Sequence, residues 1–193
     1  TCCVGTGMEN HALHGDGIYH ESGNTLWINF YTPSTVAWKS AGADLLVETD
    51  FPLGESAVIR LNLAMPGELT IMLRKPSWTD GRFAVSINGE KQAIAEANGF
   101  IALRRTWKDG DVISLVLPKS LHLEPLPDNP NRTAILWGPL VLAGEVGDDI
   151  PVMVAAGRPV EEWLKPVAGR PGVFRSDGVG REREVELMPF YQI

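Results

Sequence analysis

The chain has 193 residues, of which 44% are hydrophobic and 21% charged, a balance that suits a folded protein with a full core and argues against long disorder. Its 17 Lys and Arg against 24 Asp and Glu give a net charge of −7, so nucleic acid and anionic membrane surfaces are poor partners. No apolar run reaches the roughly 18 residues of a transmembrane helix.

The two ends of the sequence are unlike ordinary termini. The chain starts on Thr1-Cys2-Cys3 without an initiator Met or a signal-peptide pattern, and it stops on the apolar run 187–193. We therefore expect it to be a piece of a longer protein.

The first expected element is a short helix. Residues 4–7 contain two glycines, and the stretch Met8–His14 is long enough for two helical turns before Gly15 ends it. Little else in the chain favours helix, apart from a short stretch at Pro159–Lys165.

From Gly17 onward the dominant signal has a period of two, which predicts half-buried strands. Apolar residues alternate with polar ones in five runs: Leu26/Ile28/Phe30, Ile59/Leu61/Leu63, Leu69/Ile71/Leu73, Phe83/Val85/Ile87 and Ile113/Leu115/Leu117. Turn residues separate the runs, and Asn88-Gly89 is typical of a type I′ hairpin because both residues tolerate positive φ. Short alternating strands without intervening helices favour an antiparallel β-sandwich in a mainly β protein.

A proline-rich stretch after Leu117 predicts a connector and a domain boundary near residue 122. Beyond it, one apolar strand runs from Ala134 to Ala143 and is interrupted by Gly138-Pro139. The remaining residues are rich in Gly, Pro and Arg, so we expect 123–193 to be a partial second sandwich.

Cys2 and Cys3 are the only cysteines, and as neighbours they cannot form an ordinary disulfide framework. One interpretation is that they are two small buried side chains. Another is that they supply two thiolates to a zinc ion, with Glu9, His11, His14 and His20 as the potential ligands nearby. A third is a redox-active or metal-sensing dithiol. The spacing alone completes no zinc site.

The run Cys2–His11 resembles a known signature, Cys-Cys-Val-Gly-Thr-Gly-Met-Glu-Asn-His, of the β-L-arabinofuranosidases of glycoside hydrolase families 127 and 146, once catalogued as a domain of unknown function. Further motifs follow in the order seen in that family: Leu26–Ser34, Leu73–Trp78, Ser86–Gly89, Arg105–Asp111 and Trp137–Ala143. The resemblance covers nearly the whole chain and fades after about residue 145.

This resemblance implies an architecture. The family has an (α/α)6 barrel followed by β-sandwiches, so residues 1–16 would be the last segment of an otherwise absent barrel, 17–122 a β-sandwich, and 123–193 part of a second one.

The resemblance also implies residue roles. Cys2 would be both the catalytic nucleophile and a zinc ligand, and Cys3 a second zinc ligand. The other ligands, a Glu and a Cys, and the acid/base Glu would lie upstream in the missing barrel. Glu9, Asn10 and His11 could orient the cysteine loop, or only cap and pack the helix.

Two further functions stay open beside a retaining, zinc-dependent glycosidase for arabinose-containing plant glycans. The chain could be a non-catalytic module that binds carbohydrate or supports the barrel, because six Trp residues are present, although most lie among strand residues and suit packing. The redox dithiol is the other. By itself the chain should be inactive, since it lacks the acid catalyst. The sequence does not indicate an oligomeric state.

Overall fold

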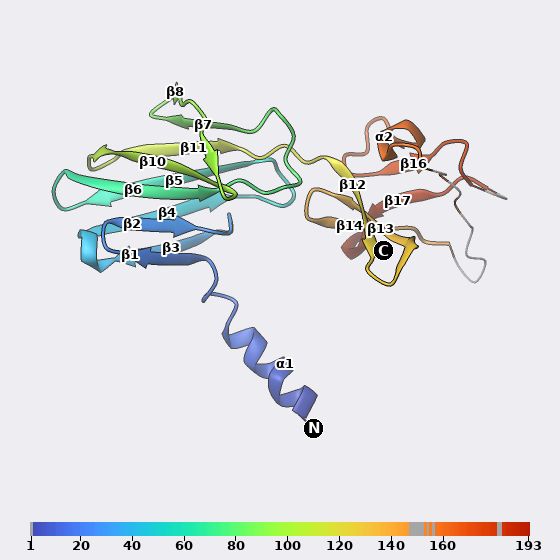
Figure 1. The fold of residues 1–193 in the computed structure, drawn as a ribbon, viewed down its shortest axis with the longest axis horizontal. Coiled ribbons are helices and arrows are strands. Elements are labelled where there is room, and N and C mark those ends of the chain that lie inside the picture. The colour runs from blue at the N-terminus through green and yellow to red at the C-terminus, as the bar shows by residue number, and fades with distance from the viewer. Residues whose placement is uncertain (1, 147–152, 154, 156, 181–182) are drawn as a thin grey trace. The chain divides into compact units, whose positions relative to one another are not determined.

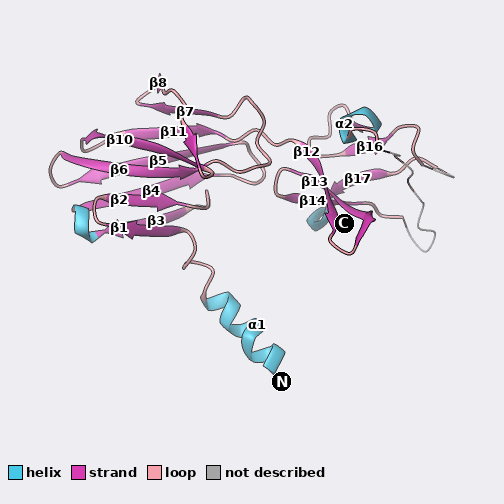
Figure 2. Cartoon of the chain, viewed as in Figure 1, coloured by secondary structure: helices cyan, strands magenta, loops and turns pink. Residues whose placement is uncertain are grey.

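A computed structural model of the chain describes residues 2–146, 153, 155, 157–180 and 183–193. The chain divides into two compact units, Thr1–Pro118 and Lys119–Ile193, each with its own hydrophobic core. Strands dominate both units, as the alternating sequence pattern predicts (Figures 1 and 2). In the described part of the chain, no helix is long and apolar enough to cross a membrane.

The first unit is a sandwich of two sheets. The five-stranded sheet has the order β1 (Tyr19–Ser22), β2 (Thr25–Ile28), β6 (Gly67–Arg74), β10 (Phe100–Trp107) and β9 (Glu96–Ala97). The six-stranded sheet has the order β3 (Ser34–Trp38), β4 (Ala43–Thr49), β5 (Ser56–Leu63), β11 (Val112–Val116), β7 (Ala84–Ile87) and β8 (Glu90–Lys91), and the 3-10 turn η1 (Lys39–Ala41) joins β3 to β4.

The core of this sandwich confirms the predicted strand faces. Alternate residues of β5, β6 and β11, such as Ile59, Ile71 and Ile113, are fully buried between the sheets. The predicted Asn88-Gly89 hairpin is also confirmed, because β7 pairs with β8 across it and the two residues have φ of 50° and 84°.

One strand pair departs from the expected antiparallel pattern. β2 and β6 run parallel, with Leu26 opposite Ile71. A parallel pair needs a long crossover connection, and here β3, β4 and β5 of the opposite sheet supply it.

The N-terminal helix α1 also differs from its prediction. It spans Cys2–Ala12 and so includes Gly5 and Gly7, whereas the sequence favours a start at Met8. A glycine in a helix costs about 1 kcal/mol relative to Ala but does not forbid the conformation.

The second unit, as far as it is described, contains one curled sheet of six strands. Their order is β12 (Leu121–Leu126), β13 (Asn129–Trp137), β14 (Leu140–Ala143), β17 (Glu186–Pro189), β16 (Phe174–Ser176) and β15 (Leu164–Pro166). The helix α2 (Val160–Trp163) lies within the predicted stretch 159–165, and η2 covers Phe190–Gln192. Trp163 and Phe174 belong to the core of this unit.

The predicted proline-rich connector is wrong in part, because much of it forms the β12–β13 hairpin around Pro127-Asp128. Pro125 is tolerated there because β12 is an edge strand, and the pairing register shifts directly after it. The units themselves divide between Pro118 and Lys119, just before β12.

Candidate functional site

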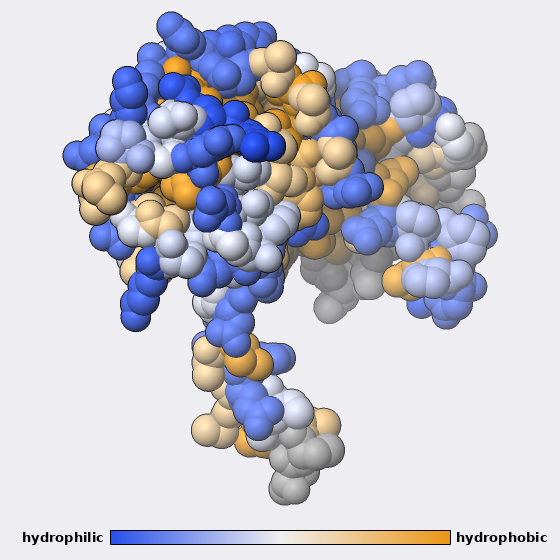
Figure 3. All heavy atoms as spheres, turned by 60° about the vertical axis from the view of Figure 1, so that its left-hand side comes forward, coloured by the Kyte–Doolittle hydropathy of each residue, from blue (hydrophilic) through white to orange (hydrophobic). Residues whose placement is uncertain are grey.

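The first candidate site is helix α1, which carries the two cysteines. Cys2 is its first residue, and the side chain of Cys2 lies outside the described part of the structure. Cys3 is exposed, and its carbonyl accepts a 3.3 Å hydrogen bond from Thr6 Oγ1. Large apolar side chains are exposed on the same helix: Val4 is 65% and Met8 70% accessible (Figure 3).

The chemistry of the cysteines suits a zinc ion. Two thiols are among the ligands that zinc prefers, and a tetrahedral site needs four ligands. Among the described residues, no three His, Cys, Asp or Glu side chains gather into a metal-binding group. A zinc site that includes Cys2 and Cys3 stays a prediction from the sequence.

Glu9, Asn10 and His11 lie on the second half of α1, and their side chains are exposed. The carbonyls of Glu9 and Asn10 both accept a 3.2 Å hydrogen bond from the Leu13 N–H, and the His11 ring packs edge-on against His14 at 5.2 Å. Seven residues of α-helix span roughly 10 Å, so Glu9 is two turns along the axis from Cys2. A role for these three residues at the cysteines stays a prediction.

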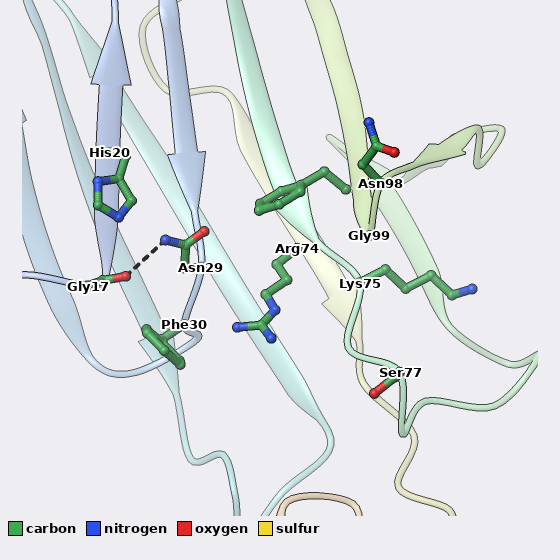
Figure 4. A pocket seen from close by; sticks show the side chains of 10 residues that line it. Gly17, His20, Asn29, Phe30, Arg74, Lys75, Ser77, Asn98 and Gly99 are labelled. Atoms are coloured by element: carbon green, nitrogen blue, oxygen red, sulfur yellow. Dashed lines mark hydrogen bonds between the residues drawn. The ribbon is translucent and has the colours of Figure 1, made fainter.

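The second candidate site is a pocket of about 530 Å³ at one end of the five-stranded sheet (Figure 4). It is lined by side chains from four strands and the segments that follow them, among them His20, Asn29, Phe30, Arg74, Lys75 and Phe100. The β9–β10 turn, Asn98-Gly99, closes one side.

Hydrogen bonds fix the backbone around this pocket. Asn29 Nδ2 donates to the Gly17 carbonyl at 3.0 Å, drawn as the dashed line in Figure 4. The buried Tyr31 hydroxyl donates to the Arg74 carbonyl at 2.6 Å. Burial raises the pKa of Tyr31 far above the usual tyrosine value, against the opposing charge of Arg74, so this hydroxyl stays protonated. The end of β6 is thereby tied to the segment after β2.

The pocket is cationic in character. None of its lining residues is Asp or Glu. Lys75 Nζ turns away and pairs with Glu96 at 2.7 Å, whereas Arg74 reaches over the Phe30 ring, with its guanidinium carbon 5.8 Å from the ring centroid (Figure 4). Within the described residues, the guanidinium of Arg74 has no carboxylate partner.

The sequence does not predict this pocket. Of its lining residues, only His20 is a predicted site residue, and it is predicted there as a potential metal ligand. A partial signal exists, because Asn29, Phe30, Arg74 and Lys75 lie within the motifs Leu26–Ser34 and Leu73–Trp78 that carry the family resemblance. Asn98-Gly99 is a second Asn-Gly pair, and its φ values of 52° and 77° repeat those of the first.

Comparisons with known proteins place the fold among glycoside hydrolases. A crystal structure of a GH127 β-L-arabinofuranosidase from Geobacillus stearothermophilus T6 is similar over 98% of this chain and 35% of its own, with 21% identity and a TM-score of 0.71. A structure described as a glycoside hydrolase covers 90% of this chain and 34% of its own, with 24% identity and a TM-score of 0.63. A GH127 β-arabinofuranosidase covers 90% and 33%, with 18% identity and a TM-score of 0.62. No curated protein sequence matches significantly.

The family profile described as the middle domain of GH127 β-L-arabinofuranosidase matches residues 25–119. Residues 25–119, in the sandwich of the first unit, therefore match the GH127 middle domain, and the fold of the chain is similar to that of GH127 β-L-arabinofuranosidases over most of its length. The chain spans about a third of the length of the solved structures that it resembles.

Proposed function

We propose that this chain is the β-sandwich portion of a retaining β-L-arabinofuranosidase that acts on arabinose-containing plant glycans. The observation that carries the proposal is the GH127 profile match over residues 25–119, which follows, after 13 intervening residues, a Cys2–His11 segment that resembles the family's signature. In this proposal Cys2 is the nucleophile, and Cys2 and Cys3 are two ligands of a zinc ion.

The exposed surface of α1 supports the proposal that this helix packs against a preceding domain. An isolated helix of about 11 residues is marginal in water. Exposed Val4 and Met8 would gain from burial against further helices.

A free thiol has a pKa of about 8.5 and is mostly protonated at neutral pH, and bound zinc would keep such a thiol deprotonated. The Cys2 thiolate would attack the anomeric carbon while the bond to the leaving oxygen breaks and an acid residue outside this chain protonates that oxygen. Water activated by the same residue would then displace the thiolate and restore Cys2, with net retention of configuration.

The test uses the longer protein that contains this chain and a chromogenic β-L-arabinofuranoside. We expect turnover that a zinc chelator abolishes and added zinc restores, one zinc per chain by metal analysis, and loss of turnover in Cys2→Ser. Undiminished turnover in Cys2→Ser would contradict the assignment of Cys2 as the nucleophile. Full turnover in protein without zinc would contradict the assignment of zinc as the cofactor. Hydrolysis of other glycosides, without hydrolysis of the arabinofuranoside, would contradict the proposed substrate.

A further inference from the structure

We infer that the pocket beside Phe30 and Arg74 binds an acidic sugar, a hexuronate residue of a glycan, with Arg74 holding the carboxylate. The inference deepens the proposed function and rests on it for carbohydrate as the ligand class. It concerns a pocket whose lining includes no residue of α1, so the bound sugar is taken to be a substituent of the glycan and not the sugar that is cleaved.

The size and lining of the pocket suit one sugar unit or two. Ligand pockets commonly enclose about 300 to 1,000 Å³ and combine apolar rings with a few polar groups, and the 530 Å³ of this pocket falls in that range. Its rings are Phe30 and Phe100, and its hydrogen-bonding side chains include Asn29 and Asn98.

The charge of the pocket points to an anion. The protein carries a net charge of −7, yet this pocket has cationic side chains and no carboxylate in its lining. Elsewhere in the first unit, Arg60, Arg82 and Arg104 each pair with an acidic side chain. Because the guanidinium of Arg74 has no such partner among the described residues, its fork of N–H donors is open to a carboxylate on a ligand.

Arg74 is also held in place before a ligand arrives. Its guanidinium lies over the Phe30 ring, and its carbonyl is held by Tyr31. In the β6–β10 register Arg74 stands opposite Phe100, so both side chains project from the same face of the sheet. A positioned arginine loses less conformational freedom on binding than a free one.

The exposed ring of Phe30 supplies a surface for a sugar. Phe30 is 50% accessible, and it packs against Gly17, where an added Cβ would lie 3.3 Å from the Phe30 Cε2 atom. Glycine at this position lets the ring lie close to the backbone. An accessible ring beside a cation and an amide is suited to the apolar face and the hydroxyls of a sugar.

The experiment is a calorimetric titration of this 193-residue chain with methyl β-glucuronide, methyl β-glucoside and acetate. We expect the glucuronide to bind about tenfold more tightly than either of the others, because only it offers both a carboxylate and a ring. Arg74→Gln should weaken glucuronide binding by about tenfold and leave weak glucoside binding unchanged.

Arg104→Gln is the matched control, since Arg104 projects from the same sheet but pairs with Glu68 at 2.8 Å. It should bind the glucuronide as the unchanged protein does. Phe30→Ala is a second variant, which removes the aromatic ring and keeps the charge of Arg74. This variant should bind the glucuronide no more tightly than it binds acetate.

Equal affinity for glucuronide and glucoside, no binding, or equal losses in Arg74→Gln and Arg104→Gln would overturn the inference. Acetate binding as tight as glucuronide binding would overturn the assignment to a sugar. The readout is separate from that of the proposed function, because Cys2→Ser should stop hydrolysis in the longer protein and leave glucuronide binding intact.

Discussion

Asn88 Nδ2 donates a 2.8 Å hydrogen bond to Asp111 Oδ1, and this bond joins two turns of the first sandwich. The second carboxylate oxygen of Asp111 accepts from the Lys108 N–H at 2.9 Å. Asn88 Oδ1 in turn accepts from the Val112 N–H at 2.9 Å. The turn after β7 is thereby locked to the turn between β10 and β11, with Asp111 only 6% accessible at the centre.

Asp111→Asn should destabilise the sandwich by about 2 kcal/mol at neutral pH, because a charge-assisted acceptor of two donors becomes a neutral amide. The measurement is urea unfolding followed by tryptophan fluorescence. Asp44→Asn is the control, since Asp44 is exposed on β4. Equal stability of the Asp111 and Asp44 variants would contradict the prediction.

The same carboxylate makes the sandwich sensitive to acid. Burial works to raise the pKa of Asp111, but the hydrogen bonds from Asn88 and Lys108 outweigh it and hold the pKa below its usual value. A lowered pKa in the folded state contributes stability above the unfolded value of about 3.9, and this contribution is lost as the pH falls through the folded pKa. The gap in unfolding free energy between the wild type and Asp111→Asn should therefore narrow below about pH 4.

The strands of this sandwich could be predicted because each buried residue alternates with an exposed one along its own strand. Ile59, Ile71 and Ile113 needed no knowledge of their partners to be assigned to the core. The pocket could not be found in this way, because Phe30 and Arg74 meet only when the parallel pairing of β2 with β6 brings their strand ends together. That pairing depends on the path of the chain through the opposite sheet, which local periodicity does not encode.

The predicted role of the cysteines depends on a longer stretch of sequence than the two residues themselves. Cys2 and Cys3 alone leave three interpretations open. Only the longer run to His11 resembles the signature of one particular family. Among the described residues, no three metal-binding side chains gather, so the zinc site stays a prediction that no local pattern completes. The sequence predicts too short a helix at the N-terminus, because the two glycines of α1 lower helix propensity without excluding the helix.

Tyr31→Phe should lower the unfolding free energy by about 1 to 2 kcal/mol at pH 7, because it removes the hydroxyl that donates to the Arg74 carbonyl. Burial raises the pKa of Tyr31 in the folded state, so its contribution is full below the unfolded pKa near 10 and is lost as the pH rises above that value. The deficit of Tyr31→Phe should thus shrink at pH 11 in the same unfolding assay. Tyr191→Phe, at an exposed position, should show no deficit at either pH.

Two fully buried tryptophans of the first sandwich should respond differently to the same substitution. Trp107 Nε1 donates to the Leu69 carbonyl at 3.1 Å, whereas Trp38 Nε1 has no hydrogen-bond partner among the described residues. Both substitutions by Phe leave a similar cavity, but only Trp107→Phe also removes a hydrogen bond. We expect Trp107→Phe to cost about 1 kcal/mol more than Trp38→Phe in chemical unfolding. An equal or larger loss in Trp38→Phe would contradict this reading.

In the second unit, two glycines of the β15–β16 loop separate the cost of backbone conformation from that of packing. Gly169 and Gly172 have φ of 74° and 80°, so alanine is strained at both positions. A Cβ at Gly169 meets nothing within 4 Å, whereas at Gly172 it would lie 2.9 Å from the Trp137 Cζ3 atom.

Gly169→Ala should therefore cost about 1 kcal/mol. Gly172→Ala should cost about 1 to 3 kcal/mol more, because the Trp137 indole, which packs edge-on against Phe174 at 5.6 Å, must shift to make room for the added methyl group. Thermal unfolding gives the two stabilities, and near-ultraviolet circular dichroism reports the displaced indole. A Gly172→Ala protein with the stability of Gly169→Ala and an unchanged aromatic spectrum would contradict this prediction, because the methyl group would then fit at residue 172 without displacing the Trp137 ring.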